Sequence, residues 1–120
     1  MSHFKYLREK LFIENTSVLN ITKKNKTPFY LYSAKQIKEN YINFVKIFKD
    51  VNPLICFAAK ANTNLTIMKM LGRLGSGADV VSGGELMKAL KAGIKPNKIV
   101  FSGVGKTEDE LKLAIKSKIL

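Results

Sequence analysis

The sequence predicts an α/β fold in which short strands alternate with helices and the strands run parallel. Two observations lead to this prediction: apolar runs of strand length, and amphipathic helical patterns that follow them. The predicted strands cover 54–59, 78–81 and 98–101, and the predicted helices cover 65–74 and the segments that begin after Ser82 and Thr107. Alternation at this spacing is typical of βαβ units with right-handed crossovers. Helices on one face of the sheet would form a barrel and helices on both faces a doubly wound sheet, and periodicity alone leaves both open.

Start signals mark three of the predicted helices. A Ser or Thr is followed three residues later by Gln or Glu, the capping-box spacing, at Ser33–Gln36, Ser82–Glu85 and Thr107–Glu110. After the first of these signals, apolar residues at helical spacing predict an amphipathic helix over 34–49. Gly93 suits the position just after the second of these helices, where a positive φ is common.

The N-terminal part has a different pattern from the alternating body. Two apolar-rich stretches, Phe4–Leu7 and Leu11–Ile13, flank a charged tripeptide and predict a β-hairpin, although the turn contains neither Gly nor Asn. The aromatic run 29–32 predicts a further strand. We therefore divide the chain into a head, residues 1–26, and a body, residues 27–120.

Length and composition are those of one globular domain, with 120 residues of which 46% are hydrophobic and 25% charged. The unusual feature is a net charge of +12, from 21 Lys and Arg against 9 Asp and Glu. The basic residues are scattered, Arg8 and Arg73 are the only arginines, and no aromatic side chains interleave with the lysines as stacking platforms. We therefore favour a lysine-rich solvated surface and expect no nucleic-acid partner. A nucleic-acid-binding domain is the alternative from another functional class.

Several classes of site and protein are disfavoured by the sequence. Cys56 is the single cysteine, so an internal disulfide is excluded, a zinc cluster is disfavoured and no metal is expected. The longest apolar run, 54–59, is far shorter than the roughly 20 residues of a membrane-spanning helix, and residues 1–8 lack the apolar segment of a signal peptide. We expect a cytoplasmic protein without membrane contact. Cys56 is expected to be a buried apolar residue, and His3 to lie unattached at the terminus.

Lys60 is the first candidate for chemistry, because it directly follows the predicted strand 54–59. By period-2 alternation its side chain shares a face with Cys56 and Ala58. An amine at the end of an interior parallel strand is expected to be desolvated, and a desolvated amine is a good nucleophile for the carbonyl of a Schiff base. A lysine that leaves the sheet and extends into solvent is the alternative.

The segments around Lys60 carry a resemblance to a known family. Residues 57–62, followed by 77–86 and 99–107, resemble the cofactor-attachment signature and later segments of the pyridoxal-phosphate decarboxylases of the alanine-racemase-type barrel family. Residues 27–33 resemble the segment that leads into that barrel. The resemblance implies that this chain is the N-terminal part of a TIM-like (β/α)8 barrel, which is incomplete because such a barrel needs about 250 residues. Overall likeness favours the family members that act on diaminopimelate, with ornithine, arginine and carboxynorspermidine decarboxylases and a racemase as alternatives.

By this resemblance Lys60 is the lysine that binds pyridoxal 5′-phosphate covalently, and Asp79 is an active-site carboxylate close to it. The resemblance implies decarboxylation of an amino-acid substrate, meso-diaminopimelate, to L-lysine and CO2, with the cofactor ring as the electron acceptor. A turn or cap residue is the alternative for Asp79. Glu85 is given no catalytic role, because the capping box with Ser82 already accounts for it.

The resemblance also implies parts of the enzyme that lie outside these residues. A glycine-rich phosphate loop, a carboxylate for the pyridine nitrogen and a catalytic cysteine would follow Leu120, and the head, residues 1–26, would pack on a C-terminal β-domain. In the family a second subunit completes the active site, so a homodimer is expected. We therefore expect the 120-residue chain to be inactive by itself.

Overall fold

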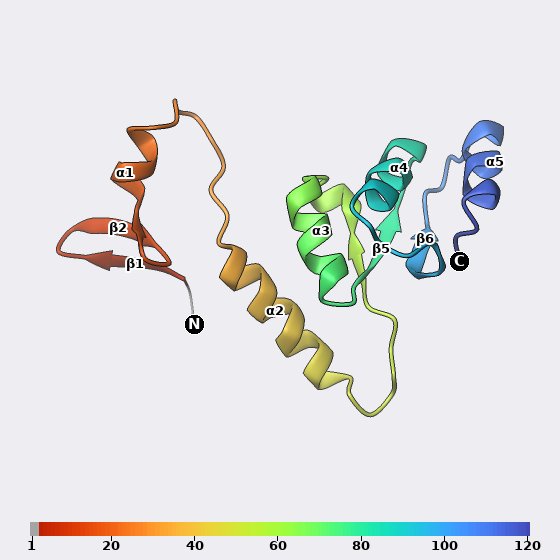
Figure 1. Cartoon of the computed structure of the whole chain (residues 1–120), viewed down its shortest axis with the longest axis horizontal. Coiled ribbons are helices and arrows are strands. Elements are labelled where there is room, and N and C mark those ends of the chain that lie inside the picture. The colour runs from red at the N-terminus through yellow and green to blue at the C-terminus, as the bar shows by residue number, and fades with distance from the viewer. Residues whose placement is uncertain (1–2) are drawn as a thin grey trace. The chain divides into compact units, whose positions relative to one another are not determined.

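The computed structural model describes residues 3–120, and the chain divides into two compact units, Met1–Tyr41 and Ile42–Leu120. Figure 1 shows the order of the helices and strands along the chain. The first unit contains an antiparallel sheet and the second a parallel one. Among residues 3–120, no helix has the length and apolar character that a membrane crossing requires. The boundary between a head and a body at residues 26 and 27 stays a prediction.

The predicted hairpin is present in the first unit. Three antiparallel strands and a short helix follow one another as β1 (Phe4–Leu7), β2 (Lys10–Ile13), β3 (Thr16–Ser17) and α1 (Val18–Thr22). The turn between β1 and β2 consists of Arg8 and Glu9, whose φ angles are 47° and 62°. Two positive φ angles are typical of a type I′ turn, which Asn-Gly usually forms. The hairpin is therefore confirmed, with two charged residues in the positions that sequence patterns assign to Asn and Gly.

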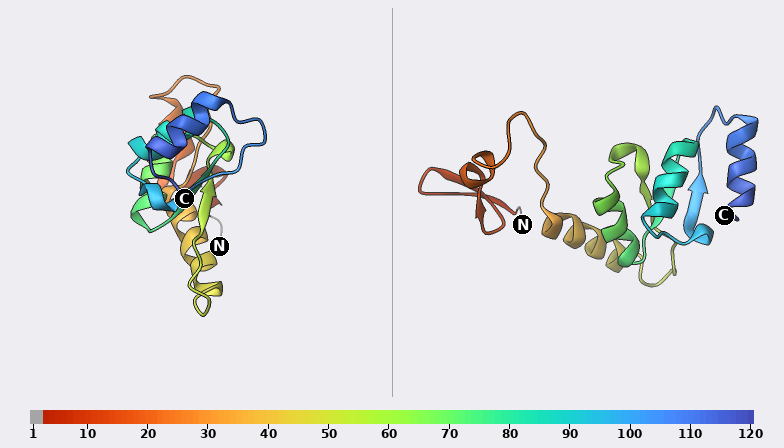
Figure 2. Two further views of the ribbon diagram at one scale, coloured as in Figure 1. Left: turned by 90° about the vertical axis from the view of Figure 1, so that its right-hand side faces the viewer. Right: turned by 45° about the horizontal axis from the view of Figure 1, so that its top comes forward.

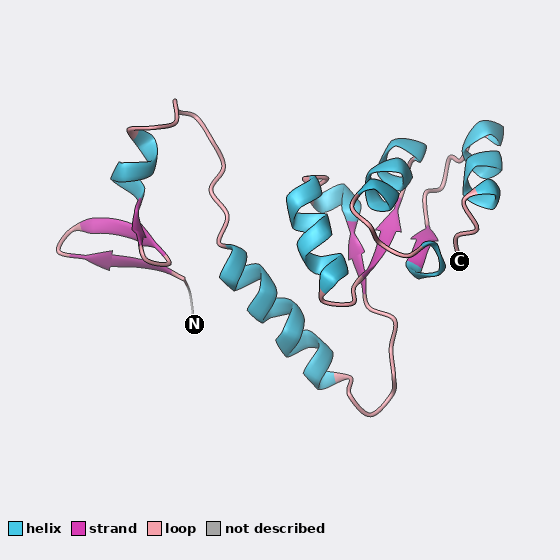
Figure 3. Cartoon of the chain, viewed as in Figure 1, coloured by secondary structure: helices cyan, strands magenta, loops and turns pink. Residues whose placement is uncertain are grey.

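The strand predicted at 29–32 is wrong. These residues are an irregular segment, drawn as loop before α2 in Figure 3, and they join neither sheet. Tyr30 is 89% exposed and Tyr32 is 53% exposed, and their rings stack at a centroid distance of 6.4 Å. Aromatic residues favour a strand only where a partner strand supplies hydrogen bonds and packing, and this segment has no such partner among the described residues.

Helix α2 (Ala34–Ile47) ends two residues before the predicted end at position 49. At its start, Gln36 N donates to Ser33 Oγ at 3.0 Å, which is one half of the expected capping box. The side-chain oxygen of Gln36 accepts instead from His3 N at 3.1 Å. The start of the predicted helix is confirmed, and its cap uses a donor from the N-terminal segment.

Charged groups connect the N-terminal hairpin to the start of α2 within the first unit. His3 Nε2 lies 2.7 Å from Glu39 Oε2, and Glu14 Oε1 accepts from the Ser33 hydroxyl at 2.7 Å and from Lys35 N at 2.9 Å. The hydrogen bond from the Lys35 backbone, followed by that from Ser33, lowers the pKa of Glu14 below its usual value. The expectation that His3 is unattached is therefore wrong. Its partner lies 36 residues away, where no local pattern could indicate it.

The second unit contains the predicted alternation of strands and helices. The parallel strands are β4 (Cys56–Ala58), β5 (Gly77–Val80) and β6 (Ile99–Phe101), adjacent in that order. The helices are α3 (Leu65–Arg73), α4 (Gly83–Lys91) and α5 (Glu108–Lys116), with the 3-10 turns η1 (Ala59–Ala61) and η2 (Pro96–Lys98). The prediction of parallel βα units is confirmed. Strand β5 has the expected length but starts one residue earlier, whereas β4 and β6 are shorter than expected, in part because η1 takes Ala59 and η2 takes Lys98.

The core of the second unit lies on one face of the parallel sheet. Ala78 of β5 is in register with Phe57 of β4 and with Ile99 of β6, so these side chains share a face. They belong to one apolar cluster with Met68 of α3 and Leu86 of α4, both fully buried. Helices α3 and α4 contact each other, as Figure 2 shows, and α5 contacts α4. In residues 42–120 the helices thus pack on one face of the sheet, the arrangement of a barrel rather than of a doubly wound sheet.

The helix ends follow the sequence signals in part. Thr107 and Glu110 form a complete capping box, and Gly93 has a φ of 82° just after α4. Ser82 Oγ accepts from Glu85 N at 3.2 Å, but the Glu85 carboxylate accepts from Val81 N instead of the Ser82 amide. The capping box predicted for α4 is therefore only half formed.

Candidate active site

Lys60 lies in the single 3-10 turn η1, directly after β4 at the carboxyl end of this strand. This turn packs against β5. The Lys60 side chain is exposed, which corrects the expectation that this chain desolvates its amine. The correction has a local cause, since η1 ends the alternation of side chains before Lys60 is reached. Within residues 3–120 the ammonium forms no hydrogen bond or ion pair, so a primary amine is available at this strand end.

Asp79 lies on β5, the strand next to β4. It is in register with Ala58 of β4 and with Val100 of β6, and it is half-buried. Its Oδ1 accepts a hydrogen bond from Ser102 Oγ at 2.5 Å. The position inside a strand rules out the alternative role in a turn or a helix cap. Asp79 in β5 and Lys60 in the turn that follows β4 therefore both lie near the carboxyl edge of the sheet, with no direct bond between them.

The sheet face that carries Asp79 is the face turned away from the core. By register and alternation, Cys56 and Ala58 of β4 and Gly77 of β5 share this face. The Cys56 thiol is half-buried, and burial raises its pKa above the usual value, with the charge of Asp79 acting in the same direction and Lys98 opposing it. The thiol is thus protonated at neutral pH and is no rival nucleophile to the amine of Lys60.

The N-terminus of α4 begins three residues after β5 and is already occupied by a side chain. The Glu110 carboxylate accepts from Gly83 N at 2.7 Å and from Thr107 N at 3.0 Å. These two backbone hydrogen bonds, first from Thr107 and then from Gly83, lower the pKa of Glu110. A helix N-terminus is a common phosphate site, but here an anion of the chain itself already takes the donor. This end of α4 therefore does not suit a cofactor phosphate, and Glu85, bonded to Val81 N, has only a structural contact.

Sequence reasoning missed Ser102, which is the hydrogen-bond partner of Asp79. The serine stands directly after β6, and its own amide donates to Val80 O at 3.0 Å. The sequence could have indicated Ser102 only through strand alternation, which places this polar residue, two positions after Val100, on the same face as Asp79. A serine after a strand is too common for that signal to be specific.

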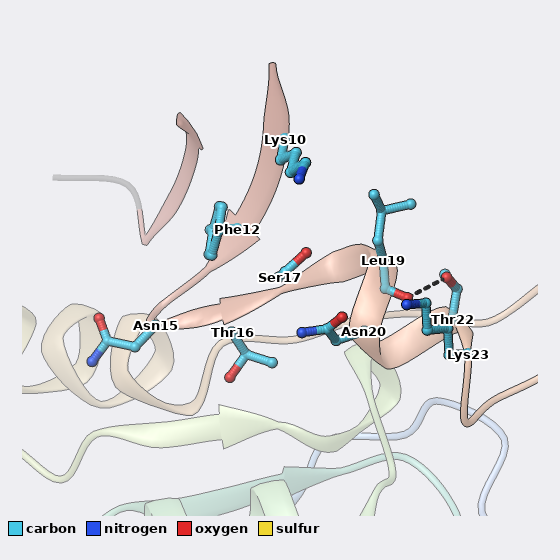
Figure 4. Close-up of a pocket in the computed structure, with 9 residues that line it drawn as sticks. All are labelled: Lys10, Phe12, Asn15, Thr16, Ser17, Leu19, Asn20, Thr22 and Lys23. Carbon is cyan, nitrogen blue, oxygen red and sulfur yellow. Dashed lines mark hydrogen bonds between the residues drawn. The ribbon is translucent and has the colours of Figure 1, made fainter. Parts of the chain in front are cut away.

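A hollow in the first unit, shown in Figure 4, contains none of the predicted site residues. It is open to solvent and is lined by Lys10, Phe12, Asn15, Thr16, Ser17, Leu19, Asn20, Thr22 and Lys23. The Thr22 hydroxyl donates to the Leu19 carbonyl at 2.9 Å, as the dashed line in the figure marks. Neutral hydroxyls, amides and two lysines supply no acid–base pair, so the hollow is not the candidate active site.

The residues that the structure places near the carboxyl edge fit one part of a pyridoxal phosphate site. A free primary amine, that of Lys60, is the group that condenses with the aldehyde of this cofactor. The carboxylate of Asp79 lies on the neighbouring strand. The N-terminus of α4 does not provide groups for the cofactor phosphate, because Gly83 N already donates to the Glu110 carboxylate. The donor set therefore fits attachment of the cofactor, and the N-terminus of α4 is not free to hold its phosphate.

Comparison with known proteins agrees with this chemistry. Residues 34–120 match the family described as pyridoxal-dependent decarboxylase, pyridoxal binding domain. A curated relative from Helicobacter pylori named diaminopimelate decarboxylase is 58% identical over 95 residues, which cover 79% of this chain and 24% of the relative. The chain thus spans about a quarter of the length of that relative.

Solved structures match the fold of the chain. A crystal structure of an Aquifex aeolicus protein aligns with a TM-score of 0.93 and 50% identity, over 98% of this chain and 29% of that protein. The Helicobacter pylori diaminopimelate decarboxylase in complex with L-lysine aligns with a TM-score of 0.83 and 51% identity, over 86% of this chain and 26% of that protein.

These matches confirm the fold class expected from the resemblance. The parallel strands β4 to β6, with their helices on one face, are the first βα units of an alanine-racemase-type barrel. The family match covers most of the chain, including Lys60 and Asp79. The chain therefore belongs to the family of pyridoxal-dependent decarboxylases, of which it contains the pyridoxal-binding domain in part.

Proposed function

We propose that residues 1–120 are the N-terminal part of a longer enzyme that decarboxylates meso-diaminopimelate to L-lysine and CO2. The observation that carries the proposal is the free amine of Lys60 at the carboxyl end of β4, within a chain of the pyridoxal-dependent decarboxylase family. Active sites of barrel enzymes lie at the carboxyl ends of the strands. The relatives named diaminopimelate decarboxylase support this substrate over ornithine, arginine or carboxynorspermidine.

In this proposal two residues of the chain have roles in the site. Lys60 would hold pyridoxal 5′-phosphate covalently through its Nζ, and it would be the amine that the amine of the substrate replaces. Asp79 supplies a negative charge on the adjacent strand, beside the segment that contains Lys60. When bound, the cofactor supplies an electron-accepting ring that makes loss of the α-carboxylate as CO2 feasible.

The complete site needs groups from outside these 120 residues. The family resemblance implies that the phosphate loop follows Leu120, and the occupation of the α4 N-terminus by Glu110 is consistent with this. The family resemblance further supports a homodimer, a cytoplasmic location, and packing of the head, residues 1–26, on a C-terminal β-domain. These features are part of the same proposal, because each completes or places the site that Lys60 begins.

The test is CO2 release from meso-diaminopimelate by the full-length polypeptide that contains this chain. Lys60→Ala is expected to abolish turnover, because it removes the amine that binds the cofactor. Lys69→Ala is the matched control, since Lys69 is an exposed lysine on α3 and is expected to be dispensable. Ornithine and arginine, offered in parallel, test the substrate. Turnover by Lys60→Ala equal to that of Lys69→Ala would overturn the proposal.

A further inference from the structure

We propose that Ser102 is a positioning residue that fixes the orientation of the Asp79 carboxylate in the site of Lys60. This inference deepens the proposed function and rests on it, because it concerns the same site. The observation behind it is the hydrogen bond of 2.5 Å from Ser102 Oγ to Asp79 Oδ1, between residues 23 positions apart. Among residues 3–120, Ser102 is the one hydrogen-bond donor to this carboxylate.

The sheet register explains why the two side chains meet. Asp79 of β5 is the neighbour of Val100 of β6, and Ser102 stands two residues after Val100. Side chains two positions apart along a strand point to the same face. The Ser102 hydroxyl therefore reaches the face of Asp79, which is the face turned away from the apolar core.

The backbone around Ser102 is held on both sides, so its hydroxyl is offered from a fixed position. Ser102 N donates to Val80 O at 3.0 Å, which extends the ladder between β5 and β6 by one residue. The next residue, Gly103, lies so close to β5 that an added Cβ would be 2.5 Å from Val81 O. Lys106 Nζ donates to Gly103 O at 2.6 Å and thereby holds the loop after Ser102 against Gly103. A donor fixed in this way selects one rotamer of the carboxylate that it binds.

The inference predicts the effect of removing the hydroxyl. Without it, the Asp79 side chain is free to rotate about its Cα–Cβ bond, and its charge is no longer held in one place beside the Lys60 segment. A hydrogen bond to a charged group contributes roughly tenfold or more in an equilibrium constant, and we expect the lower effect of a typical bond, about threefold to tenfold, because this bond is exposed to solvent. We expect Ser102→Ala to weaken binding of pyridoxal 5′-phosphate by about this factor. Ser102→Thr retains the hydroxyl and is expected to restore binding.

The test is a double-mutant cycle in the full-length polypeptide, with the dissociation constant of pyridoxal 5′-phosphate as the measured quantity. Visible circular dichroism of the bound cofactor gives this constant and also reports the asymmetry of its surroundings, independently of turnover. The variants are Ser102→Ala, Asp79→Ala and the two combined. Ser82→Ala combined with Asp79→Ala is the control, because Ser82 caps α4 and does not bind Asp79.

If Ser102 acts through Asp79, the double variant binds no more weakly than Asp79→Ala alone, whereas the effects of Ser82→Ala and Asp79→Ala add. Additive losses for Ser102→Ala and Asp79→Ala, or failure of Ser102→Thr to restore the dichroism, would overturn the inference. The wild-type protein distinguishes failure of this inference from failure of the proposed function. If the wild type carries the cofactor on Lys60 but the losses of Ser102→Ala and Asp79→Ala are additive, only the role of Ser102 is rejected. If the wild type carries no cofactor on Lys60, both the role of Ser102 and the proposed function are rejected.

Discussion

Gly77 is the position where the smallest change should disturb the site most, because β4, β5 and the end of the turn η2 meet there. A Cβ added at Gly77 would collide with the backbone carbonyl oxygen of Lys98, and would lie 2.7 Å from Cys56 Sγ and 3.3 Å from Leu54 Cδ1. A backbone oxygen can yield only if the segment that carries it, here the end of the turn η2, moves. Gly77→Ala must therefore push β5 away from its neighbours, two residues before Asp79.

The expected cost follows from this crowding. Overpacking by one methyl group in a close-packed interior costs about 1–3 kcal/mol. Since 1.4 kcal/mol is a factor of ten, this cost raises the local opening equilibrium by roughly fivefold to 150-fold. Gly72→Ala should cost less free energy than Gly77→Ala. The atom nearest to its added Cβ, at 2.9 Å, belongs to the Ile94 side chain, which is able to change rotamer.

Hydrogen–deuterium exchange of the full-length polypeptide measures this effect locally. Amides of β5 and β6 should exchange faster in Gly77→Ala by the opening factor, with peptides from the first unit unchanged. Gly105→Ala is the matched control, because no heavy atom beyond Gly105 and its two chain neighbours lies within 4 Å of the added Cβ and the φ of Gly105 is not positive. Equal exchange in Gly77→Ala and Gly105→Ala would refute the account of close strand contact at this point.

Three further predictions concern the fold and the charge of the chain. Met68→Ala removes a fully buried side chain between α3 and the sheet and should destabilise the second unit by about 2–5 kcal/mol, measured by denaturant unfolding of the full-length polypeptide. The lowered pKa of Glu110 means that its stabilisation is complete above the usual value of 4.5 and is lost as the pH falls through its folded pKa below that value. After division by the intrinsic exchange rate at each pH, the protection factor of the amides at the start of α4 should fall there in wild type and stay constant in Glu110→Gln. Binding of duplex or single-stranded nucleic acid should be weak and fall steeply with salt, and tight binding at physiological salt in a filter assay would favour the alternative class.

Local patterns predicted the elements of the second unit because each pattern there has a local cause. The apolar run before Lys60 and the Thr107–Glu110 box both act within a few residues, and the strand and the cap appear where expected. Asn64 also caps α3 by accepting from Thr66 N, and this cap too has a local signal in the sequence. An Asn directly before a helical pattern is among the better start signals.

The contacts that sequence patterns missed depend on groups brought together by tertiary structure. Glu110 reaches Gly83 from 27 residues away, and Ser102 reaches Asp79 from 23. The exposure of Lys60 was not predictable for another reason. The 3-10 turn η1 begins at Ala59, one residue before Lys60, so the alternation of side chains along β4 does not extend to Lys60. The candidate site was predictable in its residue types and strand positions, whereas its hydrogen bonds and exposure were not.

The central claim is that Lys60 carries the cofactor, and reductive labelling tests it directly. The full-length polypeptide is incubated with pyridoxal 5′-phosphate, reduced with borohydride, digested, and the modified lysine is identified by mass spectrometry. The account predicts one pyridoxyl group per chain, on Lys60, and no stoichiometric label in Lys60→Ala. A label on another lysine, or one spread over the lysine-rich surface with Lys60 unmodified, would contradict it.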